Sequence, residues 1–184
     1  MATHIDWIED QDATGELASL YQNWKEKNPG REEIPGILKC FSLSPSFLRD
    51  IIRASDTVHF TDGHLDRRTK EMIATYVSGL NQCPYWIGSH AYFLQLQDGT
   101  DDLVQALLNN NLLHKSVSEK ERYLLTFVKQ VTEHAYQTSR DDTDVLRQSG
   151  WTDPEIAETV YITALFAFFN RVADAFGLED PGYR

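Results

Sequence analysis

The stretch from Glu71 to His90, EMIATYVSGLNQCPYWIGSH, decides the fold, because it is typical of two helices joined by a short polar corner. Within the first helix, Glu71, Thr75 and Ser78 are spaced i, i+4 and i+7, which places them on one stripe. Asn81 falls at the corner. The polar stripe of the first helix therefore leads toward a polar corner.

The second helix begins at Cys83 and Pro84. Proline suits this position because the first N–H groups of a helix have no intrahelical partner. His90 lies about two turns further on. The helix–corner–helix is therefore expected to bring a carboxylate, a thiol and an imidazole toward one another, which are the groups needed to relay a proton onto a thiol.

Composition excludes several functions for the 184-residue chain. Its 17 basic and 28 acidic residues give a net charge of −11, which disfavours binding to nucleic acid or to an anionic membrane surface. The first residues, MATHIDWIEDQD, lack the basic and apolar regions of a secretory signal. The longest apolar run, Val160 to Phe169, is about half of a membrane span. We expect a cytoplasmic protein that does not bind membranes.

The pattern along the chain predicts an all-α fold of about eight or nine helices without a sheet, in one domain that covers residues 1–184. Residues 1–12 are interpreted as a polar arm, and residues 66–97 as the motif helix pair. Trp7 and Ile8 are expected to dock the arm on the body or on a neighbouring subunit. The last helix is apolar almost all round from Val160 to Phe169, which predicts a place in the middle of the core.

Two readings of Cys83 remain open. A thiol at a helix N-terminus has its pKa lowered by the helix dipole, whereas desolvation raises it, and most free cysteines are simply small buried side chains. Cys40 has no comparable setting, and we expect no disulfide between Cys40 and Cys83. The other histidines lack a defensible ligand spacing and the glycines form no phosphate-binding pattern, so we predict neither a metal nor a cofactor.

The motif Glu71, Ser78-x-x-Asn81-x-Cys83-x-Tyr85, His90 resembles the signature of the alkylhydroperoxidase AhpD-like and carboxymuconolactone decarboxylase superfamily. ATGELASLYQ near the start and GWTDPEIAETVYITALFAFFNRVADAFGL at the end resemble its longer, peroxidase-related branch. This resemblance implies an AhpD-like helical fold and a homo-oligomer, namely a dimer, trimer or hexamer. It also implies that Glu71 is a relay carboxylate, Cys83 the first thiol and His90 the base.

One departure from the family pattern bears on activity. Redox members use C-x-x-C, and the second cysteine of that motif is replaced here by Trp86. A dithiol cycle within the motif is therefore impossible, and the bulky indole is expected to fill part of the substrate pocket, together with Tyr85, Ser78 and Asn81.

Three functions follow. The first is a weakened thiol-dependent peroxidase or antioxidant oxidoreductase, in which Cys83 is oxidised by a peroxide and recycled by an external thiol reductant. The second is a non-redox enzyme in which Glu71 and His90 perform acid–base chemistry on a small organic acid. The third is a binding or structural oligomer that has lost its chemistry.

Overall fold

The computed structural model describes residues 3–31 and 33–183 and is helical throughout, with no strand in the described part of the chain. The prediction of an all-α fold without a sheet is confirmed for these residues. Three short turns supplement the helices: 3-10 turns at Asp10–Asp12 and Ala135–Gln137, and a π-helical turn at Asp56–Phe60. The nine α-helices in the described residues are α1 (Gly15–Lys27), α2 (Gly36–Lys39), α3 (Pro45–Ser55), α4 (Arg67–Leu80), α5 (Pro84–Gln95), α6 (Asp101–Leu108), α7 (Glu119–His134), α8 (Arg140–Gln148) and α9 (Asp153–Phe176).

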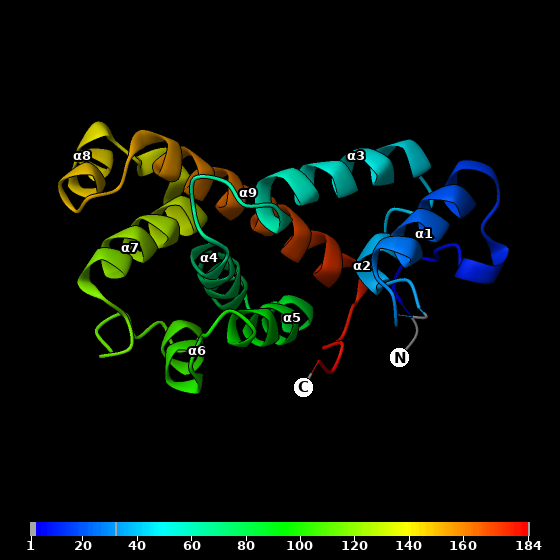
Figure 1. Cartoon of the computed structure of the whole chain (residues 1–184), viewed down its shortest axis with the longest axis horizontal. Coiled ribbons are helices and arrows are strands. Elements are labelled where there is room, and N and C mark those ends of the chain that lie inside the picture. Colours follow the sequence, from blue (N-terminus) through cyan, green and yellow to red (C-terminus); the bar gives the residue numbers. More distant parts are fainter. Residues whose placement is uncertain (1–2, 32, 184) are drawn as a thin grey trace.

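Helix α4 is the most enclosed element, because every residue from 69 to 78 is buried. Figure 1 views it nearly end-on, with α5 and α6 below it and α9 passing above. Asp66 is the N-cap residue of α4, and its carboxylate accepts a hydrogen bond from the Thr69 amide at 2.7 Å. Because α4 is surrounded, its polar side chains must find partners inside the protein.

Helix α9 runs through the middle of the molecule in Figure 1, from beside α8 to beside α2. It begins at the expected capping box of Thr152 and Glu155 and ends at Gly177, whose φ of 74° suits a helix C-terminus. By length and composition alone it is the one described helix that could cross a membrane. It packs against α4, α5 and α7, but it leaves Tyr161 60% exposed, so the expected place in the middle of the core belongs to α4 instead.

The amino-terminal arm docks on the body of the same chain. The Ile8 amide donates to Ser42 Oγ at 2.8 Å, and the Trp7 ring lies beside Gly36 and Lys39. Met1 and Ala2 lie outside the described residues. The arm covers α2, which in turn helps to form one wall of the pocket described below.

Candidate functional site

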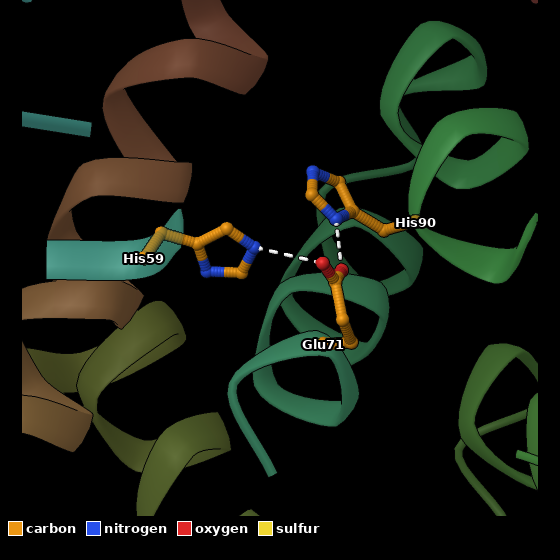
Figure 2. Close-up of side chains that lie close together, drawn as sticks. All are labelled: His59, Glu71 and His90. Carbon is orange, nitrogen blue, oxygen red and sulfur yellow. Dashed lines mark hydrogen bonds and ion pairs between the residues drawn. The ribbon is translucent and has the colours of Figure 1, made fainter. Parts of the chain in front are cut away.

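Glu71 and His90 meet in the centre of the molecule, as their spacing predicted. Glu71 projects from the second turn of α4 and His90 from the second turn of α5, and both side chains are fully buried. His90 Nδ1 lies 2.5 Å from Glu71 Oε2 (Figure 2). Because the carboxylate can only accept, we assign a proton to Nδ1 of His90, and the other ring nitrogen, Nε2, points away from Glu71. That nitrogen has no hydrogen-bond partner among the described residues.

A second histidine, which the sequence did not single out, completes the cluster. His59 lies on the π-helical turn after α3, is fully buried, and places Nε2 3.1 Å from Glu71 Oε1 (Figure 2). Its other nitrogen, Nδ1, also has no partner in the described structure. One carboxylate thus orients two imidazoles, and each imidazole keeps a nitrogen available for chemistry.

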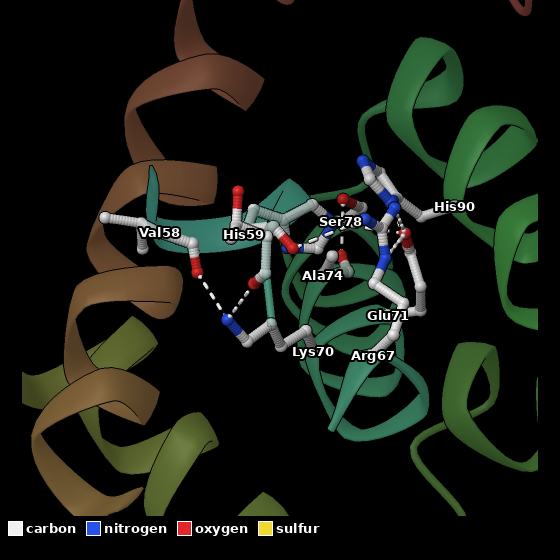
Figure 3. Close-up of polar contacts among 9 residues, drawn as sticks. Val58, His59, Arg67, Lys70, Glu71, Ala74, Ser78 and His90 are labelled. Carbon is white, nitrogen blue, oxygen red and sulfur yellow. Dashed lines mark hydrogen bonds and ion pairs between the residues drawn. The ribbon is translucent and has the colours of Figure 1, made fainter. Parts of the chain in front are cut away.

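Arg67 balances the charge of this carboxylate. It precedes Glu71 by one helical turn and donates to Glu71 Oε1 from Nε at 3.0 Å and, more closely, from Nη2. The i, i+4 spacing of the two residues is a signal that the sequence did offer. Arg67 also lies over the Phe60 ring and donates to the His59 carbonyl at 3.4 Å (Figure 3). It therefore contacts His59 as well as Glu71.

Burial and pairing set the charges within the cluster. Burial alone would raise the pKa of Glu71, but the adjacent His90 and His59 outweigh it and hold the pKa of this carboxyl well below its usual range. Burial lowers the pKa of His59 to about 4, against the opposing pull of Glu71. At neutral pH, Glu71 is therefore ionised and His59 is neutral, which is the form that a general base requires.

The cluster lies against a cavity of about 720 Å³. His59 and Trp86 contribute to the cavity wall, and Trp86 stacks on His90 with ring centroids 5.1 Å apart. Phe166 of α9 packs edge-on against both imidazoles. His59 therefore presents the cluster to the cavity directly, whereas His90 lies behind an aromatic wall. The indole nitrogen of Trp86 is buried and its N–H donor has no partner in the described structure.

Cys83 belongs to a different polar cluster. It occupies the N-cap position of α5 without a side-chain capping hydrogen bond. Its Sγ instead contacts the backbone carbonyl of Asn170 at 3.8 Å. Asn170 of α9 also accepts a hydrogen bond from Asn81 at 2.8 Å and donates one to Ser78 at 3.2 Å. No hydrogen bond or ion pair joins Cys83 to Glu71 or His90 in the described structure. The corner residues thus form a hydrogen-bonded joint between α4, α5 and α9.

The surroundings of Cys83 disfavour the thiolate. The residue is fully buried, and burial raises the pKa of its thiol to about 12, with the side chain of Asp174 acting in the same direction. Two backbone N–H groups at the start of α5 oppose the shift but do not overcome it. Of the two readings that the sequence left open, the structure supports the neutral, buried thiol. Cys40 is also free and buried.

The residues expected to line a pocket divide between the cavity wall and the corner. Tyr85 and Trp86 lie in the wall of the cavity, whereas Ser78, Asn81 and Cys83 do not. The Tyr85 hydroxyl accepts a long hydrogen bond from the Ile37 amide at 3.5 Å, which ties α5 to α2. The cavity therefore opens beside the first turns of α5 and not at the corner.

His59, Glu71 and His90 are also the one described group of such side chains close enough to hold a metal ion, since their ligand atoms lie within 4.8 Å of one another. The residues around them do not fit an ion well. A cation would compete with the Arg67 guanidinium for Glu71 Oε1 and with His90 for Oε2. An ion bound here would therefore have to displace contacts that both carboxylate oxygens already make.

Part of the chain is similar to a known protein family. Residues 45–112, which include α3 to α6, match the model of the carboxymuconolactone decarboxylase family. An uncharacterized protein 4 in the cox locus of Paracoccus denitrificans is 36% identical over 63 residues, which are 34% of this chain and 57% of the relative. The match spans little more than half of that relative.

Solved structures extend the likeness to the whole fold. An uncharacterized peroxidase-related protein with an alkylhydroperoxidase AhpD core, from Ralstonia eutropha JMP134, superposes with a TM-score of 0.86 at 21% identity, covering 99% of this chain and 94% of that one. The debrominase Bmp8 in complex with 2,3,4-tribromopyrrole superposes with a TM-score of 0.74 at 16% identity, covering 95% and 91%. At such identities the likeness concerns the fold, and the fold hosts more than one chemistry.

The family match contains both halves of the motif, Glu71 on α4 and His90 on α5, and the entire chain follows the fold of the AhpD-like structures. Residues 45–112 thus match the model of the carboxymuconolactone decarboxylase family, and the chain as a whole has the AhpD-like fold.

Proposed function

We propose that the protein is a non-redox enzyme that moves a proton on a small, largely apolar organic acid. The observation that carries this proposal is the shared carboxylate of Glu71. It orients the imidazoles of His59 and His90, and His59 lies in the wall of a cavity. A carboxylate that fixes an imidazole and stabilises its protonated form is the recurring arrangement of general base catalysis.

In this mechanism His59 is the catalytic residue. A C–H bond next to a substrate carbonyl breaks, its proton goes to the free Nδ1 of His59, and its electron pair goes to the carbonyl oxygen. Glu71 accepts the Nε2 proton of His59 in a hydrogen bond and stabilises the imidazolium that forms. The unpartnered indole N–H of Trp86 is available to donate to the developing oxyanion. His90 acts through Glu71 as a positioning residue.

The cavity wall supports an organic anion as the substrate. Its inner part is apolar and aromatic, with side chains that include Ile37, Phe93 and Phe169. Four basic residues also line it, Lys27, Arg31, Arg49 and Arg53, against one acidic residue, Asp56. Arg53 has no ion-pair partner in the described part of the chain. A basic rim on a protein of net charge −11 favours a ligand with one anionic group and an apolar body.

Two measurements test this function. Binding of benzoate should exceed binding of benzamide, an uncharged molecule of nearly the same shape, in ligand-observed NMR. Exchange of the α-protons of a panel of 3-oxo carboxylic acids in D₂O should be catalysed, and Glu71→Gln and His59→Gln should each slow it by about 100-fold or more. Cys83→Ser is the matched control and should exchange at the wild-type rate. Loss of activity in Cys83→Ser alone would overturn the proposal.

The second candidate is the one-cysteine thiol peroxidase with an external thiol as reductant. Its support is the likeness to peroxidase-related structures and the place of Cys83 at the start of α5. The buried, neutral thiol argues against it. Peroxide consumption with dithiothreitol decides between the two functions, since only the peroxidase requires Cys83.

A designed thiol sharpens the same assay. Trp86 stacks directly on His90 and faces the cavity, so Trp86→Cys places a sulfur where the histidine cluster and a peroxide both reach. We expect peroxide turnover to rise above wild type in this variant. Wild-type turnover that is already fast and lost in Cys83→Ser would favour the peroxidase.

We also propose that the protein is a cytoplasmic homo-oligomer. Large apolar side chains are exposed on α9 and around the start of α3, with Tyr161 60%, Leu43 61% and Phe47 47% exposed. Apolar patches of this kind mark interfaces, and closed homo-oligomers are the common result. Light scattering at micromolar concentration tests it, and a particle of 21.1 kDa would contradict it.

A further inference from the structure

The π-helical turn that carries His59 is not followed by another helical turn. Its last carbonyl groups therefore have no N–H donors from the helix itself. The turn continues α3 and stops at Phe60, after which the backbone becomes extended at Thr61. Carbonyl groups at a helix C-terminus carry partial negative charge and need donors, and a buried end without them is costly. The donors here come from another helix.

Two cations of α4 cap this turn. Lys70 is fully buried, and its Nζ donates to the Val58 carbonyl at 3.0 Å and to the Thr61 carbonyl at 2.8 Å. Arg67 donates to the His59 carbonyl between them. Figure 3 shows Lys70 reaching Val58 on one side of the turn while Arg67 reaches toward Glu71 and His90 on the other. The backbone around His59 is thus bonded to the helix that bears Glu71.

Glu158 of α9 locks the lysine in place. Its Oε1 accepts from Lys70 Nζ at 2.7 Å, and its Oε2 accepts from the Leu65 amide at 2.7 Å. The chain between the turn and α4 passes so close that a Cβ on Gly63 would lie 2.1 Å from Glu158 Oε1. Only glycine leaves room there, so Gly63 allows the loop to close over the ion pair.

We infer that Lys70 and Glu158 form a positioning clamp that sets the place of His59 against Glu71. The inference rests on the proposed function, because it assigns the clamp a role in preparing the base. An ion pair that served stability alone would leave the site unchanged when it is lost. Beyond any loss of stability, we expect that loosening the clamp moves His59 away from Glu71 and toward water.

His59 itself reports this movement. The groups that face its ring are Glu71 and Arg67 from α4, His90 from α5, and the uncharged Phe166 from α9. In the wild type, burial lowers the pKa of His59 to about 4. A His59 ring released to solvent should titrate near the ordinary value of about 6.5. The imidazole NMR signals, assigned with His59→Gln, give this midpoint without any substrate.

The experiment compares two variants of opposite charge. Lys70→Met removes a cation and Glu158→Gln removes an anion, so a purely electrostatic effect would shift the His59 midpoint in opposite directions. The clamp predicts that both raise it, by at least one pH unit in Lys70→Met. Gly63→Ala changes no charge, crowds Glu158, and should raise the midpoint by a smaller amount; it also serves if Lys70→Met fails to fold.

The Arg68–Glu121 ion pair supplies the control. Arg68 lies on α4 beside Lys70 but contacts Glu121 of α7 and not the turn. Arg68→Met should leave the His59 midpoint within about 0.2 units of wild type. Shifts of opposite sign in Lys70→Met and Glu158→Gln, or none in either, would overturn the clamp. Failure of the proposed function is distinguishable, because the midpoint responds even if no 3-oxo acid exchanges its protons.

Discussion

Two polar clusters flank the junction of α4 and α5, and they differ in what they leave unsatisfied. In the histidine cluster, His59 and His90 share Glu71, and each keeps a nitrogen without a partner. In the corner cluster, the amide of Asn170 is bonded to both Ser78 and Asn81. Buried polar groups that are left unpaired in a native structure point to a function, whereas fully paired groups hold elements together. A single sequence motif therefore supplies both a reactive site and a structural joint.

The largest expected effect comes from removing the shared carboxylate. Glu71→Ala leaves the partly exposed Arg67 and two buried imidazoles without their acceptor, and breaking a buried charge pair costs about 3–5 kcal/mol. Urea denaturation should show this loss of unfolding free energy. Glu71→Gln keeps one acceptor oxygen and should lose less. A loss below about 1 kcal/mol in Glu71→Ala would remove the distinction between the two clusters.

Acid should weaken the protein through the same cluster. His59 has a folded pKa of about 4, below its unfolded value, so the unfolded state binds the proton first as the pH falls. The stability that neutral His59 contributes is fully present above about pH 6.5 and is lost as the pH falls toward 4, on the order of 3 kcal/mol. Denaturation at several pH values should show this slope, and His59→Gln should flatten it between these limits.

Glu71 adds a second loss at lower pH. Its folded pKa lies well below the unfolded value of about 4.3, so its contribution is present above that value and falls as the pH drops further. The two contributions are separable, because only that of His59 operates between pH 6.5 and 5. A flat wild-type profile in that window would contradict the burial of a neutral imidazole.

A smaller effect is expected at the joint. Asn170→Ala removes the partner of Asn81 and Ser78 and should cost about 1–3 kcal/mol, because each buried polar group left unpaired carries a desolvation penalty. Proton exchange by the 3-oxo acids should remain near wild type, since Asn170 does not line the cavity. A large loss of activity with intact stability would move Asn170 into the site.

The smallest effect is expected at Cys83. Cys83→Ser exchanges a buried sulfur that meets a carbonyl for a hydroxyl of similar reach, so the stability should change by about 1 kcal/mol or less. In the native wild type, a thiol reagent such as DTNB should modify Cys83 far more slowly than in urea, because the thiolate is suppressed and the sulfur is buried. Rapid modification of the native protein would revive the redox reading.

The sequence predicted the helical fold and the meeting of Glu71 with His90, because both depend on local periodicity and on one short corner. Ser78 and Asn81 were expected to line a pocket, whereas their hydrogen bonds go to Asn170, which is 89 residues further along the chain from Asn81. His59 was missed for a similar reason. Its approach to Glu71 depends on a loop folded over Lys70 and Glu158, and no local pattern announces such a loop. Arg67 could have been found from its i, i+4 spacing with Glu71.

The π-helical turn at Asp56–Phe60 also bears on how this site can vary among chains of different length. A π turn accommodates one residue more than an α turn, so deleting one residue before His59 would restore the α-helical register. The same helix would then present its side chains rotated by about 100° per residue, turning His59 away from Glu71 while the apolar side of α3 stays packed. A gain or loss of one residue, without any change at Glu71 or His90, is enough to add or remove an imidazole from the site.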